Sequence, residues 1–162
     1  MLNLYLKVGM VLFVLNLPIL FIGTYFPFDG IKFLEIVWLS AIVVGLCMYY
    51  RRLNDGVVEL SKLVRFNYRS GALLGFWCAA WYLLIFNIVS PDLWEETLDV
   101  MRDAMKEDGF SNEEEEALRI FNKEFRQPIF QIIYNVFFYS LIFTIVSFIV
   151  GVFIKSPRQI KN

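Results

Sequence analysis

Four long apolar segments alternate with polar stretches along the chain, over residues 8–26, 33–50, 71–89 and 130–154. A helix needs about 20 mostly apolar residues to cross the roughly 30 Å hydrocarbon layer of a bilayer. Only Glu35 is charged within these segments. Backbone amides in lipid must bond within their own segment, which favours helices over open strands. The pattern therefore predicts an all-α fold: an integral membrane four-helix bundle forming a single membrane domain over residues 1–162.

The first apolar segment has a second interpretation, as a cleaved signal peptide, because Lys7 precedes it. Its apolar stretch exceeds the core of about 7–15 residues that signal peptides have, and it lacks an A-x-A-like exit. We therefore expect it to be retained as a membrane span. Pro18 should leave one backbone carbonyl of this helix without its usual partner, which Asn16 or a neighbouring helix could help to satisfy.

Basic residues are unevenly distributed between the connections. The link over residues 51–70 holds five bases and two acids, and the tail from Lys155 onward holds three bases and no acid. Because cytoplasmic flanks carry an excess of Lys and Arg, we expect this link and both termini to be cytoplasmic. A turn over residues 27–30 and a long segment over residues 90–128 would then lie on the opposite side. Apolar and basic positions interleave within the link, which also predicts an amphipathic helix in the headgroup layer.

The segment over residues 90–128 is strongly acidic, with twelve acids against five bases. Apolar residues recur at helical spacing within it, at Trp94, Leu98, Met101 and Met105. Pro91 suits a first turn, Gly109 a stop, and the S-x-x-E spacing of residues 111–114 a capping box. The sequence therefore predicts an acidic extracytoplasmic helical hairpin between spans three and four.

The acids of this hairpin admit three interpretations. They could form a solvated face over apolar stripes that pack on each other or on the bundle. They could instead offer a surface to a basic partner, for which the candidates are Trp94, Glu113, Glu114, Glu115 and Glu116. A weak divalent-cation site is the third, but no EF-hand spacing is present, and acids in a first turn already complement the helix dipole.

Polar residues within the spans form a second candidate site. An ionisable group inside a membrane is costly and often functional, which makes Glu35 a candidate proton or cation ligand. Asn16, Asn87 and Asn135 lie in the other three spans and could face it. The alternative is that Glu35, near the start of its helix, is hydrated or paired with Lys32 at the interface.

Two ladders of small residues run along the third and fourth spans. The first is Gly71, Gly75 and Ala79, and the second is Ser140, Thr144, Ser147 and Gly151. Small faces let helices approach closely in lipid, so we expect packing seams rather than a substrate path.

Composition argues against enzymatic chemistry. The chain is 58% hydrophobic, above the roughly 45–50% of soluble proteins. It has no histidine, which removes the usual neutral-pH general base and the commonest imidazole metal ligand. We expect no enzyme, no cofactor and no metal site, and the basic link is accounted for by topology rather than nucleic-acid binding.

The stretch from Tyr50 to Val58, YRRLNDGVV, followed by residues 63–71, carries a resemblance to a known family. It is similar to small bacterial four-span membrane proteins of a domain-of-unknown-function family, number 4199. In that family a basic pair, a glycine and an interfacial helix join spans two and three, and a helical, often acidic segment precedes the last span. The resemblance implies a bacterial inner-membrane location and supplies no activity or site residues.

These patterns support two hypotheses about function. The first is a non-catalytic membrane protein that self-associates, as a homo-oligomer, or docks an envelope protein partner through its acidic hairpin. The second is a small transporter or channel component, in which oligomerisation assembles a polar path from the intramembrane candidates.

Overall fold

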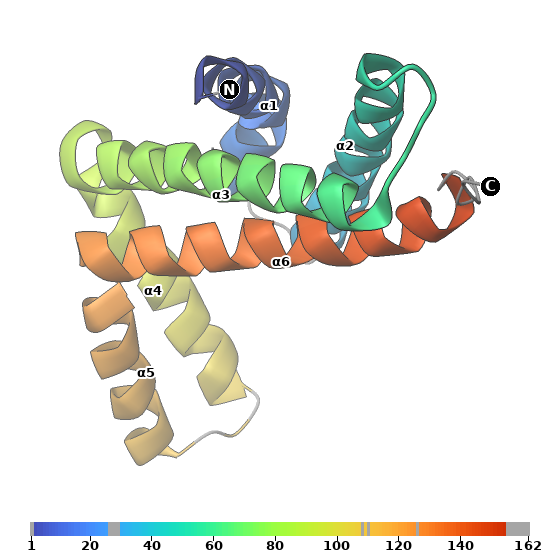
Figure 1. Cartoon of the computed structure of the whole chain (residues 1–162). Coiled ribbons are helices and arrows are strands. Elements are labelled where there is room, and N and C mark those ends of the chain that lie inside the picture. The colour runs from blue at the N-terminus through green and yellow to red at the C-terminus, as the bar shows by residue number, and fades with distance from the viewer. Residues whose placement is uncertain (1, 26–29, 108, 110, 126, 155–162) are drawn as a thin grey trace. The chain divides into compact units, whose positions relative to one another are not determined.

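The computed structural model describes residues 2–25, 30–107, 109, 111–125 and 127–154. These residues form helices and no strand (Figure 1). The helices are α1 (Leu2–Tyr25), α2 (Ile31–Leu53), α3 (Leu60–Leu84), the π-helix η1 (Ile85–Val89), α4 (Pro91–Glu107), α5 (Asn112–Phe125) and α6 (Pro128–Ile154). The predicted all-α fold is confirmed. The turn predicted over residues 27–30 and the C-terminal tail lie mostly or wholly outside the described residues.

The chain divides into two compact units. The first comprises residues 1–77 and 136–162, and the second residues 78–135. Helices α3 and α6 contribute residues to both.

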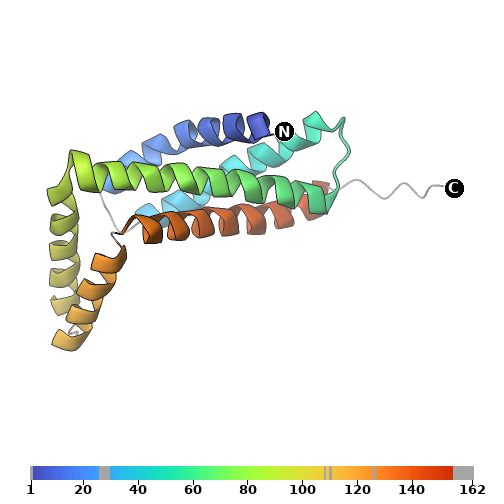
Figure 2. The same cartoon turned by 60° about the vertical axis from the view of Figure 1, so that its left-hand side comes forward.

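Contacts within the first unit show an up-and-down arrangement of four helices. The Trp38 indole donates to the carbonyl of Leu15 (3.2 Å), so α2 lies against α1, and Ile31 lies close to Gly23, which makes the pair antiparallel. Helix α3 runs beside α6 in both Figure 1 and Figure 2.

The contact between α3 and α6 is tight at both ends of the shared stretch. A Cβ atom on Gly71 would lie 2.8 Å from the carbonyl oxygen of Tyr139 and 2.9 Å from the Phe143 side chain. One on Gly151 would lie 2.5 Å from Leu60. Each ladder of small residues predicted from the sequence therefore contains a glycine at a close helix approach, as expected of packing seams.

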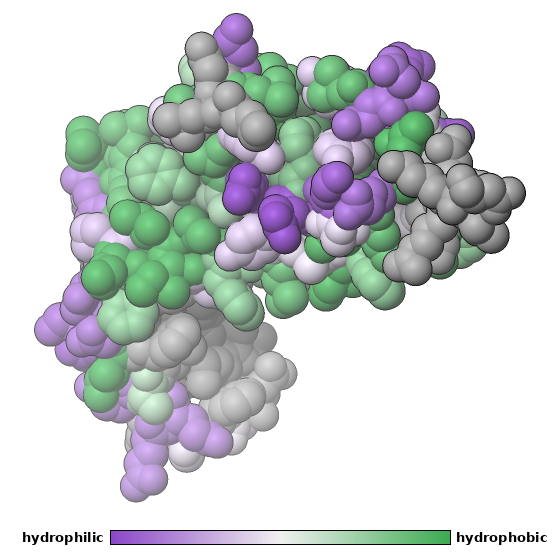
Figure 3. All heavy atoms as spheres, viewed as in Figure 1, coloured by the Kyte–Doolittle hydropathy of each residue, from purple (hydrophilic) through white to green (hydrophobic). Residues whose placement is uncertain are grey.

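The four long helices expose many large apolar side chains and bury several polar ones, which is unlike a water-soluble bundle. Large apolar side chains face outward, including Phe33 at 73% and Phe153 at 83% exposed, and apolar surface covers much of the helices in Figure 3. Polar side chains such as Asn67, Ser70 and Ser147 are fully buried. Four helices are long and apolar enough to cross a membrane. Because outward apolar surface is stable in lipid and not in water, the structure agrees with a four-span membrane protein.

Helix α1 continues through Pro18 without a break. Proline lacks an N–H group, so the carbonyl of Val14 loses its helical partner. The Trp38 indole bonds to the next carbonyl along, that of Leu15. A neighbouring helix thus bonds to the backbone in this turn, at the carbonyl that follows the one freed by Pro18.

Helix α3 begins earlier than the apolar pattern indicates. Its first residue is Leu60, so the amphipathic part of the predicted link forms the opening turns of the third span's own helix. The remaining connection is a tight turn: Gly56 donates to the carbonyl of Arg51 (2.9 Å) and Asp55 to that of Arg52 (3.4 Å). Asp55 and Gly56 have positive φ values of 51° and 82°, which is the left-handed cap of a Schellman motif. The residues that carried the family resemblance therefore build this turn.

The second unit contains α4 and α5, which contact each other. Helix α4 begins at Pro91, as predicted, and Gly109, with φ of 80°, lies between the two helices. Before α4, the last residues of the third span form the π-helix η1, in which Ser90 donates to the carbonyl of Ile85 (2.8 Å).

Candidate functional site

The candidate site in the first unit is a chain of polar contacts around Glu35. Glu35 is the fifth residue of α2 and is only 7% exposed. One carboxylate oxygen accepts a hydrogen bond from the Tyr139 hydroxyl (2.8 Å). The other lies 3.5 Å from the ammonium group of Lys32, whose side chain is 73% exposed. Glu35 is therefore paired with Lys32, as one sequence interpretation held, and it also reaches into the bundle.

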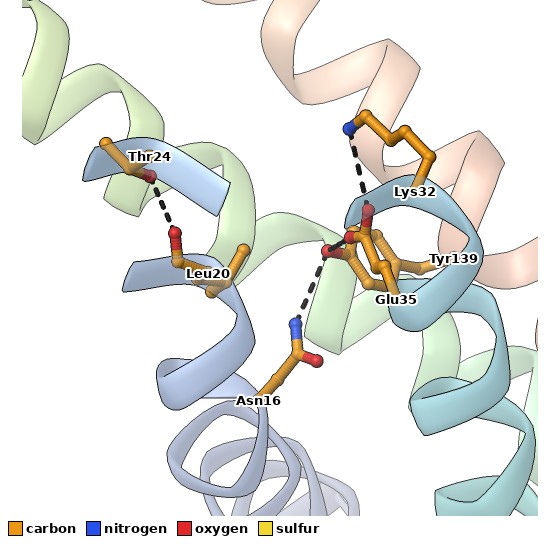
Figure 4. A network of polar contacts seen from close by, with 6 residues as sticks. All are labelled: Asn16, Leu20, Thr24, Lys32, Glu35 and Tyr139. Carbon is orange, nitrogen blue, oxygen red and sulfur yellow. Dashed lines mark hydrogen bonds and ion pairs between the residues drawn. The ribbon is translucent and has the colours of Figure 1, made fainter. Parts of the chain in front are cut away.

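Tyr139 extends the chain of contacts to a third helix. It lies on α6 and is 1% exposed, and its hydroxyl oxygen accepts a bond from the Asn16 amide on α1 (3.4 Å). Figure 4 shows the three side chains converging from separate helices. The nearby Thr24 hydroxyl bonds to the carbonyl of Leu20 in its own helix (2.7 Å) and takes no part in this chain.

The donors in this network all point toward one carboxylate. Asn16 donates to Tyr139 and Tyr139 to Glu35, while Lys32 approaches from the other side. Buried polar groups stay in a membrane bundle only when they are paired, because lipid offers no replacement partner. The arrangement can fix the rotation of α1, α2 and α6, and it places one ionisable group where water has little access.

The structure brings together two of the four intramembrane candidates. Asn16 and Glu35 share the Tyr139 hydroxyl. Asn87 and Asn135 belong to the second unit, where each donates to a residue four positions earlier in its own chain: Asn87 to the carbonyl of Leu83 (3.0 Å) and Asn135 to that of Gln131 (2.8 Å). Asn87 is exposed and Asn135 is buried.

Sequence reasoning missed two residues of the bundle's polar interior. Tyr139 counts among the hydrophobic residues when the chain is divided into apolar and polar positions, which hides its hydroxyl. Asn67 was assigned to the cytoplasmic link, yet it is fully buried on α3 and its amide lies 3.4 Å from the Cys47 sulfur. Spacing was the available signal for Tyr139. It belongs to a series of every fourth position from 131 to 151 on α6, and all positions of this series are buried.

The acidic candidates lie in the second unit, on or beside α5. Glu113, Glu114 and Glu116 are exposed, whereas the side chains of Trp94 and Glu115 are outside what the structure describes. Ser111 and Glu114 form the predicted capping box: the Ser111 N–H and hydroxyl each donate to the Glu114 carboxylate (2.9 Å), and the Glu114 N–H lies 3.4 Å from the Ser111 oxygen. The bond from the Ser111 backbone, and then that from its hydroxyl, lowers the pKa of Glu114.

The lowered pKa of Glu114 predicts a pH-dependent helix start. A carboxyl whose folded pKa is depressed contributes stability above its unfolded value, near 4.3, and loses it as pH falls through the folded value. We expect amide protection over residues 112–118 to exceed that of Glu114→Gln at about pH 6, and the two to converge as pH falls toward about 3. Hydrogen exchange on the purified protein measures this. Glu113→Gln is the matched control and should follow the wild type, whereas a pH-independent gap would contradict the capping role.

Among the described residues, no group of three or more acidic or cysteine side chains could hold a metal ion. The described residues offer one buried carboxyl group, a tyrosine hydroxyl bonded to it, and an exposed acidic surface.

Comparison with known protein families matches residues 4–156 to the family described as "Protein of unknown function (DUF4199)". The chain belongs to the DUF4199 family. The match covers both units, so the four candidate spans and helices α4 and α5 of this DUF4199 member all lie within the matched region. No curated protein and no solved structure matches the chain.

Proposed function

We propose that this DUF4199 member is a non-catalytic membrane protein that acts by associating with itself or with another envelope protein through α4 and α5. The observation that carries the proposal is the exposed acidic surface of these two helices. Nine described acids on them are exposed: Asp92, Glu95, Glu96, Asp99, Asp103, Glu113, Glu114, Glu116 and Glu124.

Charge supports a protein partner over the lipid surface. Anionic headgroups repel a segment with this excess of acids, and a basic protein surface attracts it. Three exposed bases, Arg102, Arg119 and Lys123, accompany the acids on the described part of the two helices. Exposed Ile120, at 57%, adds an apolar contact of the kind that anchors interfaces. The surface therefore suits a partner with basic and apolar groups side by side.

We further propose a location in the bacterial inner membrane, with both termini cytoplasmic and α4 and α5 on the other side. The excess of bases over residues 51–70 and in the C-terminal tail supports this orientation. An impermeant thiol reagent applied to intact cells should label a cysteine placed at Ser111 and not one placed at Lys161.

The experiment for the association proposal is crosslinking in cells, followed by mild-detergent purification and mass spectrometry. The test variant neutralises four exposed acids: Glu96→Gln, Asp103→Asn, Glu113→Gln and Glu116→Gln. We expect a crosslinked partner or second copy of the chain to be lost in this variant.

The matched control keeps the charge at the same four positions, with Glu96→Asp, Asp103→Glu, Glu113→Asp and Glu116→Asp. It should retain the partner. Equal crosslinking by the wild type and both variants would rule out an acidic docking surface.

A second candidate function is a small transporter or channel component, and the burial of Glu35 favours it. An ionisable group inside a bundle is a default hypothesis for proton or cation passage. Its test is dye-detected proton or potassium flux in liposomes. Flux that falls with Glu35→Gln supports this candidate. If liposomes that contain the wild-type protein are no more permeable than empty liposomes, the transport hypothesis is rejected.

A further inference from the structure

A stripe of three basic side chains runs along the first turns of α3. Lys62, Arg65 and Arg69 are all exposed, and their spacing of three and four residues places them on one face of the helix. Hydrophilic surface gathers over the first half of α3 in Figure 3. The stripe lies wholly within the first unit.

Helix α3 and η1 together are long enough for this stripe to lie at the depth of lipid phosphates. The third candidate span runs from Leu60 to Val89, 30 residues in all. About 20 residues suffice to cross the hydrocarbon layer. If residues 70–89, which carry no charge, make that crossing, then the preceding turns with all three bases lie in the headgroup layer.

Tyrosines support this depth independently. Tyr5 of α1 and Tyr50 of α2 both contact Phe66 of α3, with ring centroids 5.7 and 5.2 Å apart. Tyr68, on the same turns of α3, is 52% exposed. Tyrosine is enriched where membrane meets water, because its ring is apolar and its hydroxyl polar. The three bases therefore lie on the same turns as tyrosines of the kind found at the membrane–water interface.

The three bases differ in their contacts within the protein. Lys62 forms an ion pair with Glu59 (2.8 Å). The Arg69 guanidinium lies over the Tyr5 ring, 5.6 Å from its centroid. Among the described residues, the structure gives Arg65 no hydrogen bond or ion pair, although its charge acts on Glu59 at longer range. Arg65 and Arg69 are four residues apart, so their like charges repel across one helical turn. An anion between them would relieve that repulsion.

We propose that Arg65 and Arg69 bind the phosphate of an anionic lipid headgroup, with the Tyr5 ring holding Arg69 in place. Guanidinium groups bind phosphate oxygens through paired hydrogen bonds, and two of them on adjacent turns can share one phosphate. The cation–π contact orients Arg69 without using its donors. Depth favours a lipid over a soluble anion, because the apolar surface that continues along α3 accommodates acyl chains.

The test is lipid retention by the full-length protein, measured by native mass spectrometry after extraction from vesicles of equal phosphatidylglycerol and phosphatidylcholine. We expect the wild type to retain phosphatidylglycerol preferentially. The double variant Arg65→Gln with Arg69→Gln should lose this preference by about tenfold or more. Tyr5→Phe should keep most of it, because the ring remains, whereas Tyr5→Ala should weaken it.

The charge-matched control is Arg51→Gln with Arg52→Gln, at the last turn of α2, and it should keep most of the preference. If both double variants lose the lipid preference equally, the lipid is attracted by the overall positive charge and not by a specific site, and the proposal is overturned. Displacement of the lipid by millimolar inorganic phosphate would also overturn it, because it would show a soluble-anion site. The wild type alone also decides: equal retention of the two lipids overturns the proposal whether or not the variants fold.

Discussion

Replacing Gly71 by alanine is expected to destabilise the bundle by about 1–3 kcal/mol, the range for overpacked interiors. The added Cβ would lie 2.8 Å from the Tyr139 carbonyl oxygen and 2.9 Å from Phe143. A backbone oxygen cannot turn aside as a side-chain end can, so α3 and α6 would have to separate. Since Tyr139 also bonds to Glu35, the displacement would reach the polar network. Unfolding by SDS titration in mild detergent, followed by circular dichroism, measures the change.

The matched control for Gly71 is Gly45→Ala, because nothing lies within 4 Å of a Cβ atom at Gly45. Alanine has a higher helix propensity than glycine by about 1 kcal/mol, so this change should leave stability unchanged or raise it. Gly151→Ala should fall between the two, since the atoms it meets are the ends of the Leu60 and Leu63 side chains. An unchanged midpoint for Gly71→Ala would show that α3 and α6 pack less closely than the structure has them.

Features that depend on local rules could be predicted from the sequence. Four helices follow from the length of the apolar runs and the obligation of lipid-buried amides to bond internally. The Ser111–Glu114 capping box and the start of α4 at Pro91 follow from backbone donors that need partners at helix ends. The small-residue ladders predicted close packing, and Gly71 and Gly151 provide it.

The sequence did not predict two kinds of feature: where a helix extends beyond its apolar run, and which helix faces touch. Charged residues end an apolar run without ending a helix, which is why α3 begins at Leu60 while its apolar stretch begins at Gly71. The partners of Glu35 depend on the rotation of three helices, and no spacing within one helix specifies that. Asn87 and Asn135 matched the same criterion as Asn16, yet they bond within their own chain segments.

Removing the Tyr139 hydroxyl is expected to cost about 1–3 kcal/mol of stability, because a buried hydrogen bond is lost and the partners of the hydroxyl are left unpaired. Interhelical bonds measured in membranes average nearer 0.6 kcal/mol, but the burial of both Tyr139 and Glu35 favours the upper range. Tyr139→Phe should destabilise, and Glu35→Leu should do so too. The double variant should cost less than the sum, with a coupling of about 1 kcal/mol. SDS titration of the four proteins gives that coupling.

The control is Tyr49→Phe, which removes a hydroxyl from a residue on α2 that is 41% exposed. This change should have little effect on stability.

Glu35→Gln separates the possible roles of the Glu35 carboxyl group. The amide oxygen of glutamine can still accept a hydrogen bond from Tyr139, but the side chain can no longer ionise. Retained stability with lost flux in liposomes would assign Glu35 to transport. If stability is retained and liposomes with any of the variants show no flux, the network serves only to stabilise the packing of the helices. The functional surface would then be that of α4 and α5. Zero coupling between positions 35 and 139 would mean that water, rather than Tyr139, satisfies the carboxylate.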